Sequence, residues 1–140
     1  MRVGGIVSAM AVLGLIASGG IVRAAEAPPP ESSPSPTVMI KIVLDAQSRC
    51  DKAYDPPVVT IKAGTTVEWV NEDYETHTLV SSEGDDPCNP KELAPEARVI
   101  DVGQFLRLAQ YRQTFTKPGE YRYACHLPFH HMSGKVIVAP

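Results

Sequence analysis

Short segments rich in branched and aromatic residues recur from residue 38 onward, separated by turn signals such as Ala63-Gly64 and Lys117-Pro-Gly119. No long amphipathic helical pattern interrupts them. The polar, proline-broken stretch 83–96 predicts a loop with at most one helical turn near residues 91–94. The sequence therefore predicts an all-β sandwich of seven to eight strands. The predicted strands cover residues 38–44, 58–62, 65–71, 77–81, 98–102, 111–116, 120–125 and 134–139.

The beginning of the chain has a different composition from the strand region. Met1-Arg2 and the uncharged apolar run Val3–Val22 resemble a secretory signal peptide, with a small-residue cleavage site that ends at Ala24. Residues 25–36 are rich in proline and serine and predict a solvated linker. These features predict a periplasmic or otherwise exported protein with one folded domain over residues 37–140. A leader of about 20 apolar residues would also be long enough to span a bilayer if it were not cleaved.

The charge of the expected mature chain is acidic. Without Arg2 and Arg23, 11 of the 13 basic residues remain against 16 acidic ones, a net charge of −5. This balance argues against nucleic-acid binding and gives no sign of binding to anionic membranes. A basic or mixed-charge protein partner is compatible with it.

Residues 125–132 concentrate groups that bind soft metals. Cys125, His126, His130, His131 and Met132 stand within eight residues, and they include three of the four histidines of the chain. Sulfur ligands combined with imidazole select copper, or less commonly zinc, over hard cations. The sequence therefore predicts a copper site in this loop.

Alternation along a strand ranks the histidines of this loop. Neighbouring strand residues point to opposite faces, so Cys125 and His126 are not expected to bind one metal, and His126 is interpreted as a surface residue. His130 follows after enough residues for the chain to turn back toward the thiol. Met132 shares its side with His130, and His131 points away. His130 is thus the first candidate, His131 the second and His126 the third.

The fourth histidine, His77, must supply the remaining imidazole of a mononuclear site. It follows a turn-like stretch in which Asn71, Asp73 and Thr78 can form hydrogen bonds that hold an imidazole in place. A single histidine in a strand is more often structural, so this assignment depends on the rest of the site.

The three cysteines of the chain divide most simply into one pair and one free thiol. Cys50 and Cys88 both lie in loop-like sequence and are expected to form a disulfide in an oxidising compartment, which leaves Cys125 for the metal. Two unpaired surface thiols are the alternative.

Several motifs together resemble the cupredoxins, the blue copper proteins that include plastocyanin, azurin and amicyanin. The matching residues are Val59-Thr-Ile-Lys-Ala-Gly64-Thr-Thr-Val-Glu-Trp69-Val-Asn71, His77-Thr78, Phe115-Thr-Lys-Pro-Gly119-Glu-Tyr-Arg-Tyr-Ala-Cys125 and Met132-Ser-Gly134-Lys-Val136. The resemblance covers nearly all of residues 37–140. It implies a Greek-key sandwich with one copper ion, cycling between Cu(I) and Cu(II), held by His77, Cys125, a loop histidine and a weak axial methionine.

The ligand loop departs from the family pattern. Family members place several residues between the loop histidine and the methionine, whereas one residue separates His130 from Met132. Met132-Ser-Gly134 still matches the family's exit from the loop into the last strand, so Met132 is the axial candidate, with a packing methionine as the alternative interpretation.

The resemblance implies an exported one-electron carrier, monomeric and not an enzyme, that meets redox partner proteins through a small transient interface. Leu127-Pro-Phe129 would form an apolar patch for that contact. A copper-binding carrier or chaperone, which delivers or buffers copper, is the alternative that the crowded loop histidines favour. A copper-free β-sandwich interaction module is a third class, and a zinc site is chemically allowed.

Overall fold

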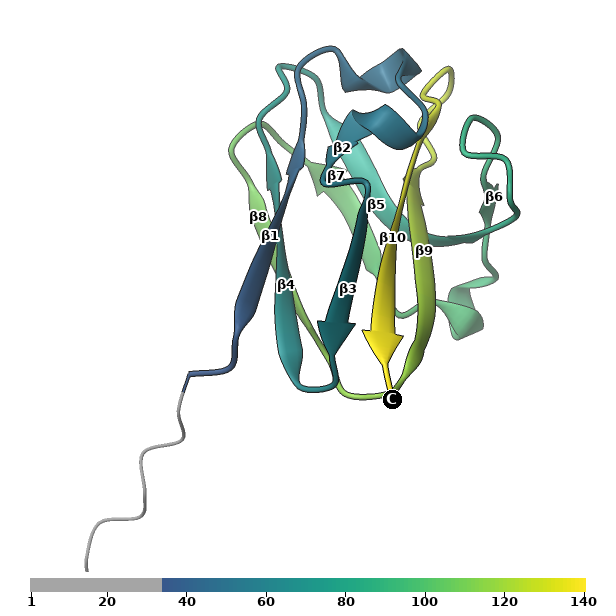
Figure 1. Cartoon of the computed structure of the whole chain (residues 1–140). Helices are drawn as coiled ribbons and strands as arrows, with labels where there is room; N and C mark the ends of the chain where they lie inside the picture. The colour runs from purple at the N-terminus through teal and green to yellow at the C-terminus, as the bar shows by residue number, and fades with distance from the viewer. Residues whose placement is uncertain (1–33) are drawn as a thin grey trace, which may run out of the picture. The chain divides into compact units, whose positions relative to one another are not determined.

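The structure is a computed structural model that describes residues 34–140, so the predicted signal peptide and most of the predicted linker lie outside the described residues. The strands are β1 (Thr37–Ile42), β2 (Tyr54–Asp55), β3 (Val58–Lys62), β4 (Thr65–Asn71), β5 (His77–Glu83), β6 (Lys91–Glu92), β7 (Asp101–Phe105), β8 (Gln110–Phe115), β9 (Gly119–Cys125) and β10 (Met132–Ala139) (Figure 1). Three short 3₁₀ helices, η1 (Ala46–Ser48), η2 (Asp51–Ala53) and η3 (Pro95–Ala97), lie between them.

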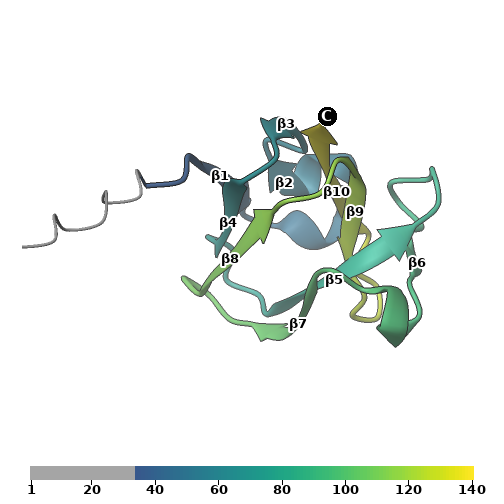
Figure 2. The same ribbon diagram turned by 90° about the horizontal axis from the view of Figure 1, so that it is seen from below.

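The strands form two sheets that face each other, as the end-on view shows (Figure 2). One sheet has the order β2-β1-β4-β8, and the other has the order β3-β10-β9-β5-β6, with β7 paired to β5. The β1–β4 and β3–β10 pairs are parallel and the remaining ladders are antiparallel. The predicted all-β sandwich is confirmed.

Side-chain alternation explains how the strands enclose the core. In β3, Val59 and Ile61 are buried, whereas the alternating residues Val58, Thr60 and Lys62 are exposed. β4 lies between two partners and is buried along almost its whole length, including Trp69. The rings of Tyr54, Trp69, Phe115 and Tyr123 pack edge to face in the core, the Trp69 and Tyr123 rings with their centroids 5.3 Å apart.

Two local predictions were wrong between residues 91 and 102. Lys91 and Glu92 do not begin a helical turn; they pair with Glu83 and Ser82 as β6. The helical turn lies four residues later as η3, and Pro95 is its first residue. Proline suits this position because the first N–H of a helix has no partner within the helix, so the missing N–H costs no hydrogen bond. The strand predicted at 98–102 is consequently displaced and begins at Asp101.

The stretch between β1 and β2 carries η1 and η2, which the sequence did not predict. Figure 1 shows both at the end of the sandwich where the loop between β9 and β10 lies, opposite the C-terminus. No helix within residues 34–140 has the length and apolar character needed to cross a membrane.

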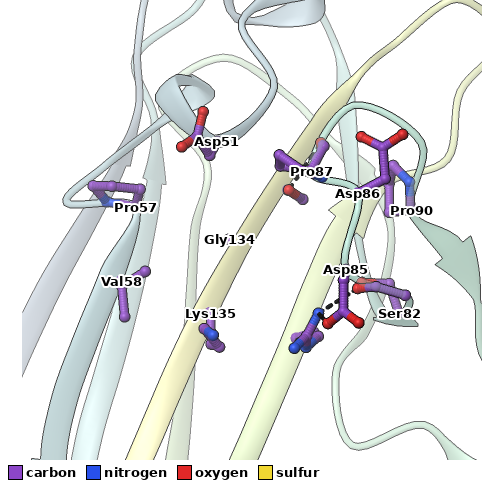
Figure 3. A pocket seen from close by; sticks show the side chains of 13 residues that line it. Asp51, Pro57, Val58, Ser82, Asp85, Asp86, Pro87, Pro90, Gly134 and Lys135 are labelled. Atoms are coloured by element: carbon purple, nitrogen blue, oxygen red, sulfur yellow. Dashed lines mark hydrogen bonds and ion pairs between the residues drawn. The ribbon is translucent and has the colours of Figure 1, made fainter.

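A disulfide joins Cys50 to Cys88, and Cys125 is free and buried, so the predicted division of the cysteines is confirmed. Cys88 belongs to the loop that follows β5. A pocket of about 140 Å³ lies beside this loop. Figure 3 shows Asp85, Asp86 and Pro87 on one side of it, Pro57 and Val58 on the other, and Gly134 of β10 between them. None of the predicted metal ligands lines this pocket.

Candidate metal centre

His77 is the first residue of β5 and is completely buried. The turn before it is shaped by Asn71, whose side-chain oxygen accepts the backbone N–H of Asp73 at 2.9 Å. The amide nitrogen of Asn71 donates to the carbonyl oxygens of Glu75 (2.9 Å) and Phe105 (2.8 Å). A short polar side chain that bonds to nearby backbone in this way fixes a turn. The turn therefore sets the position of the His77 ring.

The carboxylate of Asp73 is hydrogen-bonded to the Nε2 edge of the His77 ring. Its Oδ2 lies 2.9 Å from His77 Nε2, and the carboxylate also accepts backbone N–H groups of Asp45, Ala46 and Tyr74. Burial would raise the pKa of Asp73, but the hydrogen bonds from His77 and these backbone groups outweigh burial and lower it. Because the carboxylate accepts, His77 Nε2 carries the proton and Nδ1 keeps a free lone pair.

On the Nδ1 side of the His77 ring, three potential ligand atoms lie close together. His77 Nδ1 lies 3.2 Å from His130 Nδ1, and His130 Nδ1 lies 3.4 Å from Cys125 Sγ. All ligand atoms of this trio lie within 4.8 Å of one another. Within residues 34–140, it is the one group of three or more histidine, cysteine or acidic side chains whose spacing suits a metal ion. The structure thus brings together His77 and Cys125 with His130, the first-ranked loop histidine.

Cys125 ends β9 with its side chain almost completely buried. Its Sγ accepts the backbone N–H of Thr78 at 3.3 Å, and the Thr78 hydroxyl lies 3.7 Å from the same sulfur. The Thr78 hydroxyl also accepts the backbone N–H of His126 at 2.9 Å. Thr78 therefore supports the thiol, whereas the sequence had assigned its hydrogen bond to the imidazole.

Met132 lies directly opposite Cys125 in the β9–β10 ladder and is completely buried. Residues that face each other across antiparallel strands present their side chains on the same face, with Cβ atoms about 5 Å apart. The register therefore places the side chains of Met132 and Cys125 on the same face, despite the short interval between His130 and Met132.

The other two loop histidines lie outside the trio. His131 is exposed, and its Nδ1 donates to the carbonyl oxygen of Cys88 at 2.7 Å. His126 is not a free surface residue as predicted but is half-buried, and its Nε2 is buried without a hydrogen-bond partner in the structure. Burial of the ring lowers the pKa of His126.

Residues 45–50 connect the two halves of the site through their backbone. At one end, Asp45 and Ala46 donate to Asp73 behind His77. At the other end, the N–H of His131 donates to the carbonyl oxygen of Gln47 (2.7 Å), and the N–H of Cys50 donates to the carbonyl oxygen of His131 (2.7 Å). Sequence reasoning missed this connection because backbone atoms make it, and such bonds leave no residue signature.

The donor set fits a soft metal that prefers trigonal geometry. Metal–nitrogen and metal–sulfur bonds of about 2.0–2.3 Å place three trigonal ligand atoms roughly 3.5 Å apart, close to the spacings found here. A set of two imidazoles and one thiolate with a weak axial thioether is typical of copper centres that transfer electrons. Tetrahedral zinc would accept the same donors.

Comparisons with known proteins agree with this geometry. Residues 40–139 match the family described as copper binding proteins, plastocyanin/azurin family. A plastocyanin of Synechococcus sp. is 34% identical over 101 residues, which cover 69% of this chain and 71% of that protein. A plastocyanin of Nostoc punctiforme is 33% identical over 79 residues, which cover 52% of this chain and 54% of that protein.

Solved structures show the same fold. A purple cupredoxin from Nitrosopumilus maritimus superimposes with a TM-score of 0.54 at 25% identity, covering 72% of this chain and 98% of that one. An oxidised mutant of amicyanin gives a TM-score of 0.53 at 25% identity, covering 73% of this chain and 81% of that one.

Proposed function

The chain belongs to the plastocyanin/azurin family of copper-binding proteins, and from this premise we propose that it is an exported one-electron carrier rather than an enzyme. Members of this family bind copper and carry electrons between partner proteins. The observation that supports the proposal most directly is the trio of His77 Nδ1, His130 Nδ1 and Cys125 Sγ, gathered within 4.8 Å at one end of the sandwich.

We assign the copper ligands to His77, Cys125 and His130, with Met132 as the axial ligand. Bound copper would supply a couple between Cu(II) and Cu(I). The two oxidation states prefer different geometries, and transfer is slow when ligands must rearrange between them. The bonds from Asp73 to His77 and from Thr78 to Cys125 hold two of the ligands, so little of the site would need to move.

Electrons would enter through the half-buried ring of His130. Leu127 is partly buried and Phe129 is 91% exposed, and both belong to the turn that carries this histidine. An exposed apolar side chain beside a redox centre suits a small, short-lived contact with a partner protein. We propose that the protein works as a monomer through this contact.

Export is proposed from the signal-like leader and supported by the Cys50–Cys88 disulfide, because disulfides persist in oxidising compartments. The alternative is a carrier or chaperone that delivers copper, which the crowded loop histidines of the sequence favour. The structure favours it less, because His126 and His131 lie outside the trio and His131 is hydrogen-bonded to the carbonyl oxygen of Cys88.

The test is the visible spectrum of the copper-loaded protein together with a reversible redox titration. Intense thiolate-to-copper absorption that bleaches on reduction and is lost in Cys125→Ala would support electron transfer. His130→Ala should abolish the colour, and the matched change His126→Ala should leave it nearly unchanged. Colourless copper binding, or ready surrender of Cu(I) to a chelator, would instead favour copper delivery.

A further inference from the structure

We propose that Asp73 is a positioning residue for the copper centre, and that its carboxylate lowers the reduction potential by acting through the ring of His77. The inference rests on the proposed function, because it concerns the potential of the copper held by that site. It goes beyond that function because it assigns control of the potential to a residue that is not itself one of the proposed copper ligands.

The bond between Asp73 and His77 is direct and shielded from water. Asp73 Oδ2 lies 2.9 Å from His77 Nε2, and the two side chains are 2% and 0% exposed. The carboxylate is on the opposite edge of the imidazole from Nδ1, which faces His130 and Cys125. Only one ring therefore separates this charge from the proposed metal position.

The rest of the carboxylate is held in place by groups that only donate. Asp73 Oδ1 accepts the N–H of Asp45 (3.1 Å) and of Tyr74 (2.8 Å), and Oδ2 also accepts the N–H of Ala46 (3.1 Å). The N–H of Asp73 itself is bonded to the side chain of Asn71. The carboxylate cannot swing away from His77 without breaking several bonds, so the ring orientation is set before any metal arrives.

The sign of the effect follows from the charge. An imidazole that donates its Nε2 proton to a carboxylate is a stronger ligand at Nδ1. A buried negative charge also interacts more favourably with Cu(II) than with Cu(I), and the low dielectric of the interior strengthens this difference. Both effects favour the oxidised state, which lowers the potential.

The experiment compares wild type with Asp73→Asn, a change that keeps the side-chain shape and removes the charge. We expect the affinity for Cu(II) relative to Cu(I) to fall about 10–100-fold. This corresponds to a midpoint potential roughly 60–120 mV higher, because a tenfold change equals about 59 mV for one electron. Glu75→Gln is the matched control: it removes the same charge from the same turn, but Glu75 is exposed, and the shift should stay well below tenfold.

Nuclear magnetic resonance of the zinc-loaded wild-type protein provides a second measurement that does not depend on the variant. A His77 proton on Nε2 that exchanges slowly with water supports the proposal. A proton that exchanges rapidly, or a ring that binds zinc through Nε2, would overturn it even if Asp73→Asn failed to fold. A folded Asp73→Asn protein with an unchanged or lower potential would also overturn it.

These outcomes separate the inference from the function on which it rests. A wild-type protein without thiolate-to-copper absorption would contradict the proposed electron transfer. Two measurements on the zinc-loaded protein would then still show whether Asp73 positions the ring of His77. They are the exchange rate of the His77 proton and the loss of zinc affinity in Asp73→Asn.

Discussion

At the scale of single residues, Gly134 shows how tightly the strand behind the metal site is packed. It lies opposite Tyr123 in the β9–β10 ladder, and the ring of Tyr123 fills the space where a side chain at position 134 would be. A Cβ atom added there would lie 2.5 Å from the Cζ and hydroxyl oxygen of Tyr123, too close for any real contact. Glycine is required here by space and not by backbone conformation.

Gly134→Ala should therefore lower the free energy of unfolding by about 1–3 kcal/mol, because the buried ring of Tyr123 has to shift. The measurement is a urea titration of the copper-free protein. Gly103→Ala is the matched control in another strand, since an added Cβ at Gly103 meets nothing within 4 Å. The control should change stability by less than about 0.5 kcal/mol. Equal stability of the two variants would show that Tyr123 moves freely.

At the scale of elements, most of the longer strands were predictable, whereas β2, β6 and the short helices between the strands were not. A strand such as β3 can be predicted because apolar and polar residues alternate along it. Cys125 and His130 can be predicted as metal ligands because of the chemistry of their side chains. The 45–50 segment is held by backbone bonds to His131 and Asp73, which depend on the folded arrangement and not on residue type. His126 lies outside the ligand trio, as the sequence predicts, but the sequence does not show that its ring is half-buried.

The Cys50–Cys88 disulfide belongs to the same arrangement, and its removal should affect both stability and metal retention. In Cys50→Ser combined with Cys88→Ser, the unfolded chain loses a constraint across 38 residues. The copper-free protein should lose roughly 2–4 kcal/mol of stability in urea titrations. The ligand loop is bonded to Cys50 through His131 and Ser133, so copper should also transfer faster to a chelator.

Wild-type protein kept in reductant is the matched control for the double variant and should reach the same stability and the same release rate. Loss of stability without faster copper release would show that the backbone bonds of the 45–50 segment hold the loop without the disulfide.

At the scale of the whole molecule, the buried pair of His77 and Asp73 contributes to the response to acid. Burial lowers the pKa of His77, so below its ordinary value of 6.5 the unfolded state takes up a proton that the folded state does not. For Asp73, burial raises the pKa but the hydrogen bond from His77 and the backbone bonds lower it further, to below the ordinary 3.8. In both cases the unfolded state binds more protons in acid, and stability falls wherever this holds.

We therefore expect the free energy of unfolding of the copper-free protein to decrease from about pH 7 downward, first through His77 and His126, both with pKa values lowered by burial, and then, near pH 4, through Asp73. Urea titrations at successive pH values measure it. Asp73→Asn should flatten the lower part of this dependence, and a wild-type stability that rises toward pH 4 would contradict the assignment.

The position of the C-terminus has a practical consequence. The chain ends at the pole of the sandwich opposite the loop between β9 and β10 (Figure 1). A protein anchored to a solid support or fused to another domain through Pro140 would hold the half-buried ring of His130 toward the open solution. Attachment at this end thus orients the molecule for contact with whatever approaches from outside.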